Sequence, residues 1–101
     1  MEKLKEDHEH FKKIMSECEQ LRWSKLNDYG ITYNSYGYVG LLVKLEDKYG
    51  RIKKLYEKSL RGETPNFETS RDSLVDLVNY AVMAIMEHDR KNGKNNGNGS
   101  E

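Results

Sequence analysis

The sequence has little that would fix a fold covalently or anchor it in a membrane. It contains one Cys and one Pro in 101 residues, and its longest uninterrupted apolar stretch is Leu41-Leu42-Val43. A single thiol excludes an internal disulfide and a multi-cysteine zinc site. So short an apolar stretch excludes a membrane span and the apolar region of a signal peptide. We therefore expect a soluble protein of the reduced cytoplasm.

The chain also lacks an excess of either charge, because 17 Lys+Arg balance 17 Asp+Glu and the sequence pI is near 6.8. A neutral chain gives no strong signal for binding nucleic acid. Charged residues nevertheless make up 34% of the chain, above the roughly 25% of an average domain. This composition suits amphipathic helices with solvated outer faces, and the length suits a single domain, which we place at residues 1–91.

Apolar residues recur with the 3.6-residue period of a helix in three segments, which predicts an all-α fold. The first segment ends at Gly30 and the second stops near Gly62. The third segment is apolar over about half its circumference, so it should be the most buried helix. The sequence thus predicts a small bundle of three main helices, at about residues 3–29, 39–61 and 70–90.

Other parts of the chain break the helical pattern. Residues 31–38 contain turn formers and three tyrosines, and we expect them to form a loop. Thr69, with Asp72 three residues later, has the pattern of a short capping box and predicts the start of the third helix. Beyond Arg90 the chain is rich in Asn and Gly and has no apolar anchor. We expect residues 92–101 to be a disordered tail.

The balanced charge is unevenly distributed along the chain. Residues 44–61 hold seven basic residues against three acidic ones, whereas residues 63–76 hold four acids against one Arg. At helical spacing these charges form two longitudinal stripes beside the apolar faces of the second and third helices. The basic stripe is Lys44, Lys48 and Arg51, and the acidic stripe is Asp72, Asp76 and Asn79.

These two stripes admit two interpretations. Salt bridges between them would set the register of the second and third helices. Alternatively, a polyphosphate site would use the cations to neutralise phosphates, with Asp72 and Asp76, one turn apart, holding Mg²⁺. The first helix adds two cations, Arg22 and Lys25, within the angular range of its apolar residues. Buried there, these cations would need a partner or a ligand.

Three motifs occur in order along about residues 8–88. They are Lys25-Leu26-Asn27-Asp28-Tyr29-Gly30, then Lys44 followed by Lys48-Tyr49-Gly50-Arg51, then Ser70-Arg71-Asp72 followed by Asp76-Leu77-Val78-Asn79-Tyr80-Ala81. In these motifs the chain resembles the nucleotide-modification-associated domain type 1 family, small all-α domains of phages and bacteria. The resemblance implies an association with nucleotide or base modification, without a defined reaction.

More distantly, the chain is similar to all-α nucleoside triphosphate pyrophosphohydrolases of the MazG type. In those enzymes the Mg²⁺ sites use a Glu-Glu-x-x-Glu motif on one helix and Glu-x-x-Asp on another. Here the second helix offers only Glu46 and Asp47, surrounded by cations, and the third offers Asp72 and Asp76. The full acidic cluster is therefore absent, and hydrolysis by that mechanism is not implied.

Together, the motifs and the helical geometry predict one site for a nucleotide or nucleotide-derived small molecule. Phosphates would lie on the cations, Asn79 would contact a base edge, and Tyr29 or Tyr80 would stack on the base. Asp72 or Asp76 would bind Mg²⁺ or a sugar hydroxyl. The candidate ligand-binding residues are Arg22, Lys25, Asp28, Tyr29, Lys44, Lys48, Arg51, Asn79 and Tyr80, and the candidate metal ligands are Asp72 and Asp76.

No residue is identified as catalytic, and two alternatives to a nucleotide-handling domain stay open. One is a non-catalytic protein that sequesters a nucleotide or a nucleotide-derived signal. The other is a helical interaction module whose charge stripes are salt bridges only. His8 and His10, at i and i+2, lie on different sides of a helix and predict solvated surface, and Cys18 among apolar neighbours predicts a buried thiol.

The predicted helices are long and thin, so their shared core is small for a stable domain. Four aromatic residues are left over once the apolar faces are packed, and a second copy would cover them. We therefore expect a symmetric homodimer that packs helices into a four-helix or larger core. The surplus aromatic residues are Trp23, Tyr33, Tyr36 and Tyr38.

Overall fold

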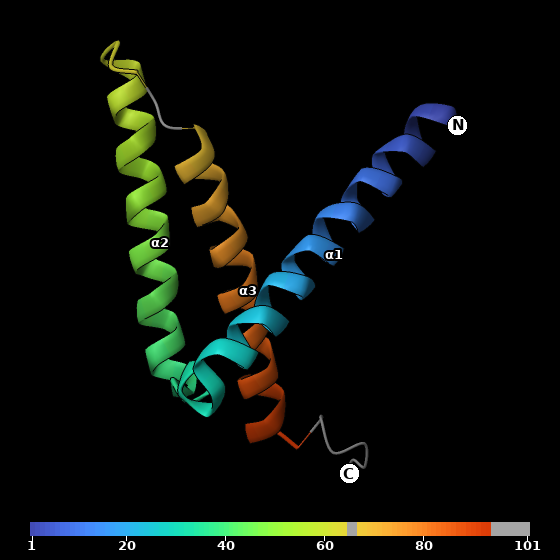
Figure 1. Ribbon diagram of the computed structural model, residues 1–101, viewed down its shortest axis with the longest axis vertical. Helices are drawn as coiled ribbons and strands as arrows, with labels where there is room; N and C mark the ends of the chain where they lie inside the picture. The colour runs from blue at the N-terminus through green and yellow to red at the C-terminus, as the bar shows by residue number, and fades with distance from the viewer. Residues whose placement is uncertain (65–66, 94–101) are drawn as a thin grey trace. The chain divides into compact units, whose positions relative to one another are not determined.

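The structure, a computed structural model, describes residues 1–64 and 67–93. Within these ranges the chain forms three α-helices and a short 3-10 helix and contains no strand, which confirms the all-α fold class (Figure 1). In chain order the elements are α1 (Glu2–Tyr29), the 3-10 helix η1 (Gly30–Asn34), α2 (Gly37–Leu60) and α3 (Phe67–Lys91). Each predicted helix corresponds to an observed one, with ends that differ by a few residues.

Glycine follows the first two helices, as predicted. Gly30 follows α1 with a φ of 63°, and Gly62 lies just beyond α2 with a φ of 81°. This left-handed conformation is strained for a residue with a Cβ, so glycine lets the chain leave the helix at low cost. The segment expected to be a loop is partly ordered as η1, because short 3-10 helices are common connectors between longer elements.

The start of the third helix differs from the prediction. Because α3 already includes Phe67, Thr69 lies in the first turn of the helix and is not its N-cap. A capping pattern marks where a helix can begin, but it does not prevent the preceding residues from adding to the helix. The predicted disordered tail lies outside the described residues from position 94 onward.

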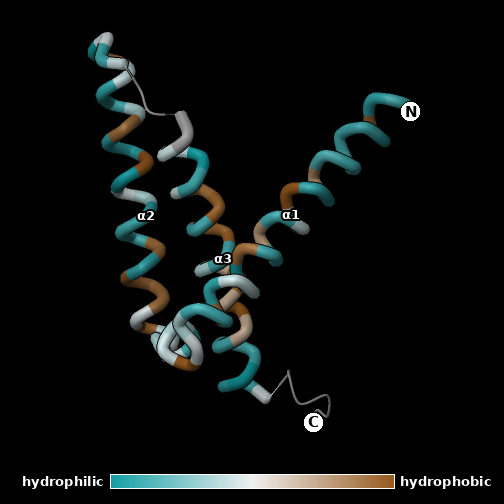
Figure 2. The backbone as a smooth tube through the Cα atoms, in the orientation of Figure 1, coloured by the Kyte–Doolittle hydropathy of each residue, from teal (hydrophilic) through white to brown (hydrophobic). Residues whose placement is uncertain are grey.

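By its internal contacts the chain divides into two compact units, residues 1–35 and residues 36–101. The first contains α1 and η1, and the second contains the helical hairpin of α2 and α3. Apolar segments recur along both helices of the hairpin, whereas the N-terminal half of α1 is mostly hydrophilic (Figure 2). None of the described helices combines the length and the apolar character needed to span a membrane. A single domain over residues 1–91 stays a prediction.

The core of the second unit forms where α2 and α3 run antiparallel and pack against each other (Figure 1). Leu41 of α2 is 2% exposed. Most buried residues belong to α3, which confirms that the most apolar helix is the most buried. The buried residues of α3 are Ser73, Val75, Asn79, Tyr80, Met83 and Ala84.

The prediction that three tyrosines are left unpacked within one copy of the chain is wrong. Tyr33 is buried, with the Lys25 ammonium 5.8 Å from its ring centroid, and Tyr36 and Tyr38 are half-buried. Tyr36 packs against Tyr80 and Tyr38 against His88, so these two rings are covered by α3 and not by a second copy. Of the four aromatics, only Trp23 is exposed. The homodimer itself stays a prediction, and it needs a different surface.

Two neighbouring leucines of α2 test this core. Replacing Leu41 with Ala should lower the free energy of unfolding by about 2–5 kcal/mol, because it leaves a cavity among buried side chains. The same change at Leu42, which is 44% exposed, should cost less than about 1 kcal/mol. Urea denaturation followed by circular dichroism measures both values. Equal losses at the two positions would show that Leu41 lies outside the core.

Candidate functional site

The basic and acidic stripes meet at one ion pair between α2 and α3. Lys48 Nζ lies 3.1 Å from Asp76 Oδ2, and the two side chains are 27% and 16% exposed. The interhelical salt bridge is therefore confirmed for this pair. Because the helices are antiparallel, residues before Lys48 on α2 lie level with residues after Asp76 on α3.

Aromatic contacts extend from this ion pair toward the start of α2. Tyr36, immediately before α2, packs edge-on against Tyr80 of α3, with ring centroids 6.0 Å apart. The ammonium of Lys44, one turn before Lys48, lies 5.1 Å from the centroid of the Tyr36 ring. Cation–π contacts of this kind contribute roughly 0.5–2 kcal/mol. We use the name hairpin cluster for Tyr36, Lys44, Lys48, Asp76, Asn79 and Tyr80.

Asn79 is the buried amide of the hairpin cluster. It lies on α3 between Asp76 and Tyr80 and is 4% exposed. Its Nδ2 atom is buried and has no hydrogen-bond partner among the described residues. Leaving a buried donor unpaired costs about 1–3 kcal/mol. Buried polar groups are nearly always paired in native proteins. We therefore expect the Nδ2 group of Asn79 to donate to an acceptor that the described residues do not supply.

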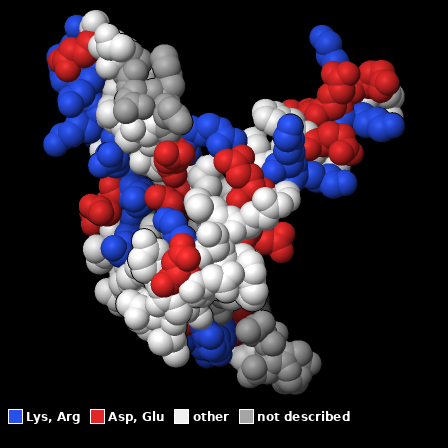
Figure 3. Space-filling view, viewed as in Figure 1, with Lys and Arg blue, Asp and Glu red and all other residues white. Residues whose placement is uncertain are grey.

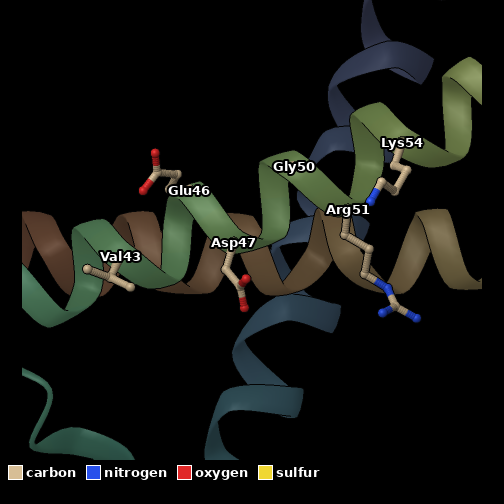
Figure 4. A pocket seen from close by; sticks show the side chains of 6 residues that line it. All are labelled: Val43, Glu46, Asp47, Gly50, Arg51 and Lys54. Atoms are coloured by element: carbon tan, nitrogen blue, oxygen red, sulfur yellow. The ribbon is translucent and has the colours of Figure 1, made fainter.

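Arg51, the third cation of the basic stripe, lies apart from the ion pair. It is exposed and forms no ion pair within the described part of the chain. Its side chain borders a shallow groove on α2, where Asp47 points to the same side of the helix (Figure 4). The groove is lined by Val43, Glu46, Asp47, Gly50, Arg51 and Lys54.

Sequence reasoning does not single out this groove, although the sequence contains a signal for it. Gly50 lies inside a helix, where glycine costs about 1 kcal/mol relative to alanine. A Cβ built at Gly50 would meet nothing within 4 Å, so the residue leaves a notch in the helix surface. Charged residues border this notch at helical spacing. A glycine in mid-helix with such neighbours is the pattern that predicts a surface groove.

Positive charge dominates the C-terminal half of α2, where Lys and Arg gather on the surface (Figure 3). Arg61 at the end of this region pairs with the nearby Glu63 across 3.1 Å, and both side chains are more than half exposed. Lys48 alone among the cations of the basic stripe pairs with a carboxylate within the described residues. The stripe therefore keeps a net positive charge at Lys44 and Arg51.

The acidic stripe fits Mg²⁺ poorly in this arrangement. Asp72 is exposed, and Asp76, one turn further on, already has the Lys48 ammonium beside its carboxylate. Such a cation occupies the position in which a metal ion would approach the oxygen atoms. Among the described residues, no three His, Cys, Asp or Glu side chains gather as a metal site. The Mg²⁺ expected from the sequence stays a prediction.

The first unit holds the other candidate residues. Arg22 donates a hydrogen bond from Nη2 to Oδ1 of Asn34 over 3.1 Å, while its buried Nε has no partner among the described residues. Lys25 lies over the Tyr33 ring. Both cations are half-buried, as expected for charges within the apolar range of a helix. The exposed candidates of this unit are Asp28 and Tyr29.

The structure thus gathers part of the predicted site in each unit. Lys44, Lys48, Asp76, Asn79 and Tyr80 belong to the hairpin, where contacts connect most of them. Their combination with the candidates of the first unit stays a prediction. Two smaller expectations are confirmed: Cys18 is buried, and His8 and His10 of α1 are exposed.

Comparison with known proteins adds no relative, because no family model, no curated protein and no solved structure matches this chain. The geometry of the hairpin cluster is therefore the main basis for an assignment of function. That geometry combines half-buried cations, an aromatic pair and a buried amide donor.

A double-mutant cycle on Lys48→Met and Asp76→Asn tests the ion pair. We expect a coupling energy of about 1–3 kcal/mol in the free energy of unfolding, because both groups are largely removed from water. The matched control is Arg61→Met with Glu63→Gln, an exposed pair at the same distance. That pair should couple by less than about 0.5 kcal/mol. Equal coupling in both cycles would contradict a structural role for Lys48 and Asp76.

Proposed function

We propose that the hairpin of α2 and α3 binds a nucleoside phosphate. One observation supports this most directly: Lys48 is neutralised by Asp76, whereas Lys44 and Arg51, one turn to either side, have no carboxylate partner among the described residues. The two remaining cations are about 10 Å apart along the helix axis, at ~1.5 Å per residue. Two cations at this spacing suit a ligand with more than one negative charge.

The aromatic pair and the buried amide support a base as the second part of the ligand. Asn79 carries an amide donor and an amide acceptor, and its donor lacks a protein partner within the described residues. Tyr36 is half-buried and offers a ring edge or face, while the buried Tyr80 holds it in place. In this proposal Tyr36 contacts the base, Asn79 hydrogen-bonds its edge, and the cations bind the phosphates.

The resemblance to nucleotide-modification-associated domains supports the same ligand class. It points to nucleotide or base modification in the cytoplasm of a bacterium or a phage-infected cell. We propose that the chain binds the nucleotide, without a claim that it converts it. The candidates of the first unit stay proposed as additional contacts to that nucleotide. They are Arg22, Lys25, Asp28 and Tyr29. The proposal requires no metal ion, and Mg²⁺ enters the experiment below as a variable.

A second candidate function is a helical interaction module without a small ligand. The Lys48–Asp76 ion pair favours it, because this pair accounts for two members of the charge stripes by structure alone. In that case Lys44 would only pack on the Tyr36 ring and Arg51 would be a solvated surface cation, so removing either would leave every binding measurement unchanged.

Calorimetric titration with nucleoside mono-, di- and triphosphates, each with and without Mg²⁺, tests the proposed ligand. Arg51→Met keeps much of the apolar stem but removes the charged fork. We expect this variant to lose about 1.5–3 kcal/mol in binding free energy with the fold intact. Lys53→Met, which removes a cation from the opposite face of α2, should leave the affinity unchanged. Unchanged affinity in folded Arg51→Met would exclude Arg51 from the site.

The wild-type titration decides between ligand binding and an interaction module. If folded protein binds none of these nucleotides at millimolar concentration, the proposal is wrong. If one binds, mass spectrometry of that nucleotide after long incubation separates the remaining functions. A sequestering protein returns the nucleotide unchanged, whereas an enzyme converts it.

A further inference from the structure

A second apolar face runs along α3, opposite the side that carries the hairpin core. At 100° per residue, Leu74, Val78, Val82 and Ile85 lie within an arc of about 80°. Met83, which is buried, lies on the other side of the helix. Leu74, Val82 and Ile85 are exposed, with Ile85 at 58%. Exposed aliphatic side chains in a continuous row are typical of a surface that another helix covers.

The apolar residues of this face are spaced almost symmetrically about position 80 of α3. Val78 and Val82 lie two positions on either side of position 80, and Leu74 and Ile85 lie at almost equal distances beyond them. A symmetric contact between two identical helices places each residue against its counterpart across the two-fold axis. With the axis near position 80 and the helices antiparallel, Val78 would meet Val82, and Leu74 would meet Ile85.

The two ends of the face carry opposite charges. Arg71 and Asp89 lie nine positions on either side of position 80, on the same line of the helix as Val78. Within the chain Arg71 already has a polar contact, and Asp89 Oδ1 lies 3.7 Å from His88 Nδ1. In an antiparallel pair, Arg71 of each copy would approach Asp89 of the other, so this additional attraction occurs twice. A parallel pair would place Arg71 against Arg71 and Asp89 against Asp89. The charges therefore favour the antiparallel arrangement and disfavour the parallel one.

We propose that a second copy of the chain docks antiparallel on this face of α3 and forms a symmetric homodimer. The observation that selects a second copy over an unrelated partner is this self-complementarity of apolar and charged positions. A contact along one helix is small compared with the roughly 800 Å² per partner of a standard interface. We therefore expect a dissociation constant in the micromolar range. Because this face is opposite Asp76, a docked copy would not contact the hairpin cluster, and the proposal is independent of the proposed ligand.

Sedimentation of the full chain from about 1 to 300 µM tests the dimer. We expect a concentration-dependent shift from monomer to dimer in the wild type. Val78→Asp places two carboxylates near the axis and should raise the dissociation constant at least tenfold. The control Val43→Asp, at an exposed valine of α2, should leave it unchanged. A wild type that stays monomeric at 300 µM overturns the proposal.

A charge exchange at the ends of the face tests the antiparallel register without disturbing its apolar centre. Arg71→Asp alone should weaken the dimer severalfold, because it places a carboxylate opposite Asp89. Adding Asp89→Arg should restore the wild-type dissociation constant. Since both positions are at the surface, this pair decides the question even if Val78→Asp fails to fold. No recovery in the double variant, or a dimer weakened by Tyr49→Asp on α2 and not by the α3 variants, overturns the proposal.

Discussion

The contact between α2 and α3 is the constraint on which the other features of the hairpin depend. Buried residues of both helices hold the contact, and the Lys48–Asp76 ion pair marks its register. A slip by one helical turn would place Lys44 beside Asp76 and would separate Lys48 from that carboxylate. The register thus decides which cation of the basic stripe is neutralised and which cations stay available to an anion. The register of α2 against α3 therefore links the packing of the hairpin to the proposed binding.

The two sides of helix α3 differ in what they contact. One side supplies the buried residues of the hairpin together with Asp76 and Tyr80 of the hairpin cluster, and the opposite side presents the aliphatic row that ends in Arg71 and Asp89. A helix apolar over half its circumference is more apolar than contact with a single neighbour requires. The second face accounts for this excess if another copy covers it. Ligand binding and dimerisation then use separate surfaces and do not compete.

The sequence predicts much of the fold because local chemistry determines it. Gly30 and Gly62 end helices through their own backbone freedom, and apolar periodicity identifies α3 as the most buried helix. Salt bridges between the two charge stripes are one of two interpretations of the sequence, because both stripes border an apolar face, and the structure shows one of them, Lys48–Asp76. Tertiary packing decides the rest. The burial of Tyr33 depends on how η1 folds back, and the unpaired donor of Asn79 depends on its surroundings. Neither is encoded in the spacing of residues along one helix.

The side-chain amide of Asn79 provides the most direct measurement of the central claim, that the hairpin cluster binds a nucleotide. In an amide-detected NMR titration, the Nδ2 signals of Asn79 should shift when a nucleoside phosphate is added. Inorganic phosphate alone should shift signals near Lys44 and Arg51 but should leave the Asn79 amide unchanged, because it has no base. A nucleoside phosphate that binds without moving the Asn79 signals, or that shifts only signals of α1, would contradict the account.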